Sequence, residues 1–543
     1  MLLNGPAMRI RLGTASLEAV SCVMAVASAL TLNPARAVAQ DSPTSATSDA
    51  STAPNAAARR VDLVTCQSRV GERHQCTANT SAGVALVKST GEPSCLLGKT
   101  WGYDDKGVWV ANGCSGEFQL GQAHETGAQP PAAGPGVQDP QEPTKLRIES
   151  WGEFEPGDGF LVGRNSKGEL SISGYALMRY LNQTRGEQTF TDHLGNTRSV
   201  DGRNDIWPHR TMVFFKGWLG DPKLIYVLTF WTVLDTNQNA IFGNLGYQFS
   251  RKFSVYAGLN GNPGSRSLQG SHPFWLGNDR VMADEFFRAF FTAGVWAQGE
   301  AVPGLWYNVM LGDNNSILGV TSSQLDRKFT YGASSWWMPT TKEFGPKGAY
   351  GDWEHHEKLA TRFGFSSTWS PEQRLTNESG GPENTTLRLA DSVNLFETGA
   401  LAPGVTIDTA DYKILSLDAG IKYKGIYLQT EVYNRWLDTF KADGALPVRS
   451  IHDTGFYVQG AFFPIPKKLE LYGATSQIYG DKGGFSNSSE YLAGMNFYLA
   501  DSRNHRLNIQ VHNVNHSPVS SAFGYYIGGL HGPVVAATLS VYF

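Results

Sequence analysis

The chain has 543 residues and is rich in glycine and in aromatic residues, with 60 glycines, 14 tryptophans, 21 tyrosines and 28 phenylalanines, yet its mean hydropathy is -0.27. It contains no uninterrupted apolar stretch of about eighteen residues, which excludes a helical membrane protein. The formal net charge of -4 offers no basic surface for a nucleic-acid partner.

Residues 1–39 have the features of a signal peptide. Met8–Arg11 carries positive charge, Ser21–Leu32 is mostly apolar or small, and Ala37–Ala39 has the small-x-small form of a cleavage site. Cys22 stands at the start of the apolar stretch instead of after it, so we expect no lipid on it. Residues 40–59 are rich in Ser, Thr and Ala and are predicted to be disordered.

Residues 60–120 hold the remaining cysteines, Cys66, Cys76, Cys95 and Cys114. Four cysteines in a short exported segment indicate two disulfides that stabilise a small core. Because Cys66 and Cys76 flank a predicted turn, we pair them across one hairpin and Cys95 with Cys114, although three connectivities are formally possible. A zinc site is the competing interpretation, which the lack of a CxxC pair and the oxidising compartment disfavour.

The spacing of these cysteines, with Trp101–Asp104, Gly107–Val110 and Phe118, resembles the exported cysteine-rich domain-of-unknown-function family 3011. That resemblance implies no activity. Residues 121–145 then form a Pro- and Gly-rich stretch, including Gly127–Pro135, which predicts a semi-rigid linker to a second domain.

Residues 146–543 read as strand-sized segments between turns, and they predict an all-β fold, a transmembrane antiparallel β-barrel of about sixteen strands. An even count places both chain ends in the periplasm. The candidate strands are 168–182, 210–220, 223–234, 240–249, 253–260, 287–298, 306–313, 329–338, 359–369, 414–422, 426–436, 455–463, 469–479, 490–499, 506–515 and 534–543.

Alternation along these segments supports the barrel. In 426–436, one face carries Tyr, Gln, Glu, Tyr and Arg435, which suits a wet lumen, and the other face is mostly apolar. The paired aromatics Trp336–Trp337 and Tyr525–Tyr526 are interpreted as girdle residues at the membrane surface, with ordinary packing as the alternative.

The last ten residues alternate to a terminal aromatic. Phe543, Val541 and Leu539 share one face, and Ser540 and Tyr542 the other. The strand predicts closure of a barrel, and its terminal Phe resembles the assembly signal of Gram-negative outer-membrane proteins. An ordinary amphipathic strand in a secreted β protein is the alternative.

The segments Trp151–Arg164, Ala176–Gln183, Tyr256–Gly261 and Gly277–Arg288 resemble Gram-negative porins of the phosphate-selective (O and P type) superfamily. The resemblance implies a sixteen-stranded, trimeric diffusion channel in the cell outer membrane, in contact with lipid, lipopolysaccharide and the barrel-assembly machinery. It does not establish phosphate selectivity, because no lumen ladder of Arg and Lys can be mapped onto this sequence residue by residue.

The segment Arg266–Arg288 is the candidate for a loop that folds inward and narrows the pore, because it is long, does not alternate and carries both signs of charge. We expect basic and acidic side chains to oppose one another across the opening, with salt bridges of an external loop as the alternative; they are Arg266, Arg280, Arg288, Asp279, Asp284 and Glu285. Arg179 and Arg435 are weaker lumen candidates.

No cofactor, metal site or enzymatic activity is expected. Trp353–Glu357 contains two histidines and two glutamates but lacks the HExxH spacing, and no nucleophile elbow or P-loop occurs. Sequence does not exclude a barrel hydrolase. The main competing function is an outer-membrane anchor whose residues 60–120 hold cell-wall glycan through Trp101, Tyr103 and Trp109, for which core packing is the favoured alternative.

Overall fold

A computed structural model describes residues 63–80, 84–91, 95–96, 99–104, 106–120, 159–233, 238–269, 274–315, 328–345, 348–374, 387–481, 484–520 and 524–543. The chain forms two compact units, Met1–Val137 and Gln138–Phe543. The predicted signal peptide (1–39), disordered segment (40–59) and linker (121–145) lie outside the described residues and stay predictions.

The first unit is a small β domain of two three-stranded sheets, ordered β1-β6-β3 and β2-β5-β4. Its core is small, with Trp101, Val108, Val110 and Phe118 buried beside two half-cystines. The strands are β1 (Leu63–Gln67), β2 (Arg73–Thr77), β3 (Val84–Ser89), β4 (Trp101–Asp104), β5 (Gly107–Ala111) and β6 (Ser115–Leu120).

Two disulfides stabilise this domain. Cys66 is joined to Cys76 and Cys95 to Cys114, the connectivity that the sequence favours. Cys66 and Cys114 are themselves buried in the core. A core this small needs such cross-links to outweigh the entropy of the unfolded chain.

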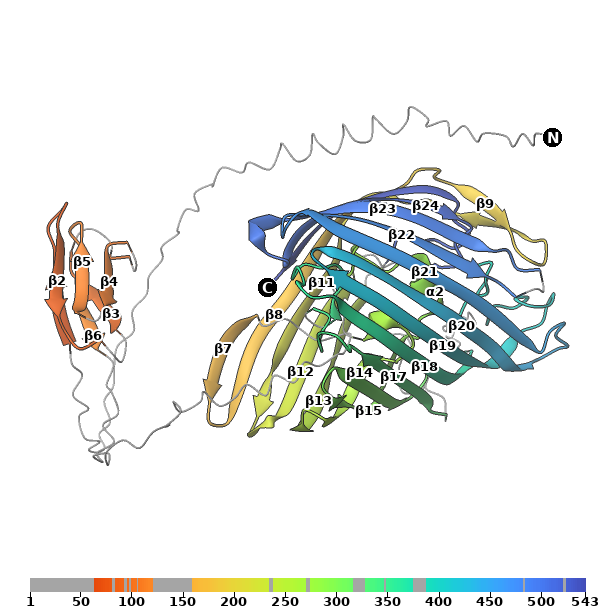
Figure 1. Ribbon diagram of the computed structural model, residues 1–543, viewed down its shortest axis with the longest axis horizontal. Coiled ribbons are helices and arrows are strands. Elements are labelled where there is room, and N and C mark those ends of the chain that lie inside the picture. Colours follow the sequence, from red (N-terminus) through yellow and green to blue (C-terminus); the bar gives the residue numbers. More distant parts are fainter. Residues whose placement is uncertain are drawn as a thin grey trace, which may run out of the picture. The chain divides into compact units, whose positions relative to one another are not determined.

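The second unit is a closed antiparallel β-barrel (Figure 1). Sixteen strands close it in the described part of the chain, which confirms the predicted fold class and count. They are β8 (Gly168–Gln183), β11 (Asn204–Leu219), β12 (Asp221–Val233), β13 (Gln238–Ser250), β14 (Phe253–Gly261), β15 (Phe291–Val302), β16 (Leu305–Gly312), β17 (Thr330–Trp337), β18 (Ala360–Gln373), β19 (Ile407–Tyr423), β20 (Ile426–Ala442), β21 (Ser450–Ile465), β22 (Leu469–Tyr479), β23 (Ser488–Tyr498), β24 (His505–Asn515) and β25 (Gly532–Tyr542).

The barrel closes where β25 pairs with β8, from Val534 opposite Gln183 to Tyr542 opposite Tyr175. A further strand, β7 (Phe160–Asn165), pairs with the first part of β8, from Asn165 opposite Gly168 to Phe160 opposite Ile172. The terminal Phe543 stacks on Phe160, with ring centroids 5.5 Å apart. The last strand therefore forms the seam of the barrel, as its alternation predicts.

Side chains alternate between an apolar outside and a polar inside. On β20, Leu428 and Val432 are 47% and 42% exposed, whereas Gln429, Glu431 and Arg435 are at most 1% exposed. On β25, Leu539 faces outward. An apolar outer surface around a polar interior is the arrangement that a barrel in lipid requires.

Connections differ at the two ends of the barrel. At the end where the chain terminates, most strands are joined by tight turns, such as Lys424–Gly425 between β19 and β20. The other end carries long connections, including a hairpin of β9 (Gln188–Thr191) and β10 (Thr197–Val200). One long connection at the turn end is exceptional, the one between β17 and β18.

Three details differ from the sequence predictions. Residue Phe287 ends the short helix α2 (Met282–Phe287), and β15 begins only at Phe291. Tyr525 and Tyr526 lie inside the barrel instead of in a girdle, because their hydroxyls take part in buried hydrogen bonds. Trp336 likewise points inward and is 1% exposed, whereas Trp337 is 48% exposed.

Within the described residues, no helix is long and apolar enough to cross a membrane. Besides α2, the helical turns whose bounds lie wholly in the described ranges are η2 (Arg266–Leu268) and η5 (Leu499–Asp501).

The disulfides make a testable contribution. Reduction of the full-length protein should open residues 63–120 to protease while the barrel stays intact, because each disulfide is worth about 2–4 kcal/mol in so small a domain. Limited proteolysis followed by mass spectrometry checks this, with a Cys95→Ser/Cys114→Ser variant as a control. Equal resistance before and after reduction would contradict it.

Candidate pore constriction

The connection between β14 and β15 folds into the barrel. We call its described residues, 262–269 and 274–290, the inserted segment. It is buried almost throughout, and α2 packs against the inner faces of β20, β21 and β22. In Figure 1, α2 is drawn within the ring of strands. The structure therefore places all six charged residues of the predicted constriction in the lumen.

Arg266 is the most enclosed of these charges and is 0% exposed. Its backbone N–H donates to Glu431 Oε1 at 2.9 Å, and its Nε donates to Gln429 Oε1 at 2.7 Å. Its guanidinium also lies 4.4 Å from the ring centre of Tyr350. The inserted segment is thus joined to the opposite wall, β20, through a charged side chain.

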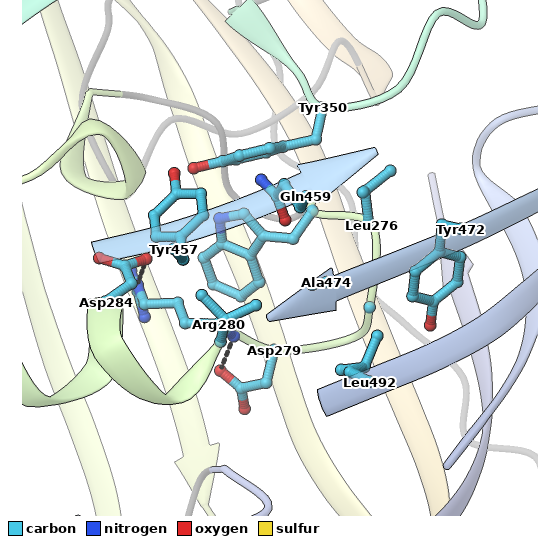
Figure 2. A pocket seen from close by; sticks show the side chains of 13 residues that line it. Leu276, Asp279, Arg280, Asp284, Tyr350, Tyr457, Gln459, Tyr472, Ala474 and Leu492 are labelled. Carbon is cyan, nitrogen blue, oxygen red and sulfur yellow. Dashed lines mark hydrogen bonds and ion pairs between the residues drawn. The ribbon is translucent and has the colours of Figure 1, made fainter. Parts of the chain in front are cut away.

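Arg280 meets two carboxylates of its own segment in different ways, that of Asp284 through its guanidinium and that of Asp279 through its backbone N–H (Figure 2). Its Nε donates to Ser267 Oγ at 2.8 Å and lies 3.8 Å from Asp284 Oδ2. The guanidinium stacks over Trp275 at 4.4 Å. Asp279 is paired instead with Arg210 of β11, at 3.3 Å.

Arg288 makes a bidentate pair with Glu285, at 3.0 and 2.9 Å. Two of the three arginines therefore have their ion-pair partners within the segment, not across an opening. The opposing charges come from the wall, where Arg362 of β18 pairs with Asp418 of β19 at 3.0 Å and Arg435 of β20 pairs with Asp453 of β21 at 2.6 Å.

The two weaker candidates also face the lumen. Arg179 of β8 donates to the Gly524 carbonyl at 3.0 Å, and Arg435 stacks over Phe286 of α2 at 4.0 Å. Sequence reasoning missed the wall residues Arg362 and Asp418. Their signal was present, since each charge occupies an inward position of an alternating strand, but it is spread over single residues far apart in the chain.

Glu490 of β23 ties three elements together. Fully buried, it accepts hydrogen bonds from the Met282 backbone N–H at 2.9 Å, from Tyr526 Oη at 2.6 Å and from Ser476 Oγ at 3.1 Å. His512 Nδ1 lies 2.7 Å away. One carboxylate thus fixes the start of α2, the connection after β24 and the wall.

Small cavities remain beside the inserted segment. One lies against β21, β22 and β23 and is lined by residues that include Trp275, Arg280, Tyr350, Tyr457, Gln459 and Tyr472 (Figure 2). The second lies toward the turn end and is lined by residues that include Tyr175, Arg210, Phe274, Trp275, Arg503 and Arg506. Trp275 lines both cavities, so it stands between them.

The long connection between β17 and β18 also enters the barrel. We call its described residues, 338–345 and 348–359, the turn-side segment. It contains Asp352, Glu354 and His356, whose potential ligand atoms lie within 4.8 Å of one another. Both ring nitrogens of His356 already face carboxylates, Nδ1 that of Asp352 and Nε2 that of Glu343. The arrangement is better described as an ionic cluster than as a metal site.

The ionic cluster is charged near neutral pH. Burial alone would lower the pKa of His356, but its hydrogen bonds to Asp352 and Glu343 outweigh burial and raise that pKa to about 9. Burial alone would raise the pKa of Asp352, but the His356 ring and the Gly425 backbone N–H lower it below its usual range. A protonated imidazole between carboxylates therefore anchors the segment to the β19–β20 turn.

In the small domain, the three predicted glycan-contact aromatics have different environments. Trp101 is 5% exposed and belongs to the core, whereas Tyr103 is 45% exposed. Trp109 lies flat over Gly102, where a Cβ would come within 2.6 Å of its ring, and Arg73 covers it at 4.0 Å. Only Tyr103 thus offers an open aromatic face.

Comparison with known proteins finds a family match within the first unit and weak likenesses for the second. Residues 52–135 match the family described as "Protein of unknown function (DUF3011)", which confirms that resemblance. No curated protein matches the sequence.

Several solved structures are similar to the barrel at low identity. The anion-selective porin from Comamonas acidovorans is 12% identical, over 69% of this chain and 100% of that one, with a TM-score of 0.39. Pseudomonas putida OprB at high pH is 9% identical, over 70% and 94%, with a TM-score of 0.39. Acinetobacter baumannii OccAB1 is 11% identical, over 72% and 99%, with a TM-score of 0.37. These likenesses assign no family to the barrel, and membership of the phosphate-selective superfamily stays a prediction.

Glu490→Gln should loosen the inserted segment. The substitution removes the charge that strengthens at least three hydrogen bonds, each worth about 1.5–3 kcal/mol when one partner is ionised. Hydrogen exchange should show faster exchange of the Met282 amide and its neighbours, with the wall strands unchanged. Glu357→Gln, at an exposed site, is the matched control. Equal protection in both variants would show that Glu490 does not hold the segment.

The ionic cluster should make the stability of the turn-side segment fall as the pH rises, whereas a paired carboxylate alone would make that stability fall as the pH drops. Because the pKa of His356 rises from 6.5 to about 9 on folding, its stabilisation is complete below about 6.5 and is lost as the pH rises through 9. Protection factors of residues 348–356 should fall over that range in the wild type and should stay flat in His356→Gln. A parallel fall in both proteins would rule out His356 as the cause.

Proposed function

We propose that the protein is an outer-membrane channel for passive diffusion of small hydrophilic solutes or ions, small anions such as phosphate among them, without enzymatic activity. One observation carries this proposal: the lumen of an apolar-walled barrel contains a charged inserted segment facing charged wall residues. Burying so many ionised groups is costly. A purely structural barrel would not require them, whereas a pore uses them to attract and orient polar solutes.

The pore that we propose is narrow. The two small cavities lie on either side of Trp275 and together follow the inserted segment from the turn end toward β21–β23. Arg280 and Arg506 flank this tryptophan, since Arg280 stacks on its ring and Arg506 donates to its carbonyl at 2.7 Å. Solutes would therefore pass a strip of alternating aromatic and cationic groups.

Two unpartnered donors support the anion part of the proposal. Nη1 of Arg266 and Nη1 of Arg362 have no hydrogen-bond partner among the described residues, although both side chains are 0% exposed. Guanidinium donors of this kind bind oxyanions well. Asp418 and Glu431 lie close by, so we expect only a modest preference for anions.

The compartment and assembly follow from the same proposal. A disulfide-stabilised first unit fits an oxidising compartment, and we place it in the periplasm, with the barrel in the outer membrane. A homotrimer is our proposal for the assembled channel. One of the structurally similar proteins, OmpT of Vibrio cholerae, is described in a trimer form.

The competing proposal, in which the first unit binds cell-wall glycan, rests on a single exposed aromatic, Tyr103. Retention of the full-length protein on peptidoglycan, and its loss on Tyr103→Ala, would support it. No retention of the wild type would dismiss it.

Solute flux into proteoliposomes tests the channel. Vesicles containing the folded protein should swell in small sugars or amino acids and hardly at all in larger oligosaccharides, because the cavities are small. In a salt gradient, the reversal potential should shift slightly toward the anion equilibrium potential, and Arg362→Gln should reduce that shift. No swelling with any solute would contradict the channel, and an unchanged reversal potential would remove Arg362 from the pathway.

A further inference from the structure

The turn-side segment fills the lumen from the end opposite to the long connections. Barrels of this kind usually have short turns at that end, as this chain has at Lys424–Gly425. Here Phe344 and Ala349 are 0% exposed and Tyr350 is 4% exposed, so the segment is packed inside the barrel instead of lying beneath it.

The inner part of this segment, residues 344–345 and 348–350, meets the inserted segment directly. Arg266 Nη2 donates to the Gly348 carbonyl at 2.5 Å, and the Arg266 guanidinium stacks on Tyr350. The Tyr350 backbone N–H donates to the Phe274 carbonyl at 2.9 Å. Two segments that enter from opposite ends therefore touch inside the lumen.

The inner and outer parts of the turn-side segment are held differently. The inner part is held through its carbonyls, since Lys422 Nζ donates to Phe344 and Ala349 at 2.8 Å and Arg503 Nη2 donates to Tyr350 at 2.7 Å. The outer part is fixed by the His356 ionic cluster and by the Gly425 N–H bond to Asp352. Flexible Lys and Arg side chains can exchange acceptors without disturbing that cluster.

Glycines with positive φ lie in this region, including Gly345 directly after Phe344 and Gly351 directly after Tyr350. Gly345 has φ of 84° and Gly351 has φ of 73°, conformations that other residues rarely adopt. Such positions absorb backbone rotation and are suited to be hinges. A Cβ at Gly351 would also come within 2.2 Å of Glu470 Oε1, so the segment passes very close to the wall there.

We propose that the turn-side segment is a gate of the channel, in addition to the constriction formed by the inserted segment. Phe344, Ala349 and Tyr350 close the passage against the inserted segment, and Arg266 holds the two segments together. This inference rests on the channel function proposed above. The proposal assigns the restriction of flow to two segments that enter from opposite ends of the barrel, so the inserted segment alone does not set the conductance.

Single-channel recording of a Phe344→Ala/Tyr350→Ala variant tests the gate. The variant removes two lumen side chains and leaves the wall strands unchanged, so the conductance should rise at least about twofold over the wild type. Leu359→Ala is the matched control, because it truncates an exposed apolar side chain of the same segment. It should conduct as the wild type does.

The outcomes separate the two proposals. A conducting wild type with an unchanged double variant would overturn the gate and leave the channel standing. Silence of the wild type and of every variant, each shown to be folded by its heat-modifiable migration, would overturn both. A conductance that is larger in the double variant than in the wild type, and unchanged in Leu359→Ala, supports both proposals.

A second measurement covers the case in which the double variant does not fold. Ala349→Cys would place the single free thiol of the mature chain in the gate, because the other four cysteines are paired. Reaction with a small, membrane-impermeant thiol reagent should lower the current of the open channel. Proven modification without a change in current, or complete protection from the reagent while the channel conducts, would overturn the gate.

Discussion

Closure of the strand ladder is the constraint on which the rest of the structure depends. Hydrocarbon offers no hydrogen-bond partner to a free strand edge, so a sheet can cross a membrane only as a closed barrel. Here the seam between β25 and β8 joins the last residues of the chain to its first long strand, and Phe543 packs over it. The alternation of side chains follows, because closure fixes which face meets lipid and which face is enclosed.

Closure creates a second requirement, since the enclosed charges need partners. Arg266, Glu490 and Arg435 each join elements that are remote in the chain, Arg435 through its contact with Phe286, and an isolated buried charge would be strongly destabilising. The inserted and turn-side segments supply some of these partners, such as the Met282 N–H and the Gly348 carbonyl. The same contacts that stabilise the interior therefore narrow it, so folding and the restriction of flow share one set of residues.

Sequence reasoning succeeded where the pattern is local and failed where partners are distant. Alternation of apolar and polar residues located the sixteen barrel strands, and its absence in the sequence of 266–288 located the segment that folds inward. Alternation and its absence can both be read from neighbouring residues. It misplaced Phe287 and Tyr525–Tyr526, since an aromatic that fills a lumen and one that faces a headgroup look alike in one dimension. It gave no role to the turn-side segment, whose buried part is held by Arg266 and Lys422. The carboxylate partners of Arg280 and Arg288, which lie within the same segment, were equally hidden, because sequence does not show which of several nearby carboxylates an arginine meets.

The size of the conductance of the unmodified protein tests the account most directly. Recorded across a planar bilayer, the folded mature chain should give discrete steps that are small for a sixteen-stranded barrel, because segments from both ends occupy its lumen. Large ohmic steps would contradict the filled lumen, and a protein that is folded and inserted but gives no steps would contradict the channel itself.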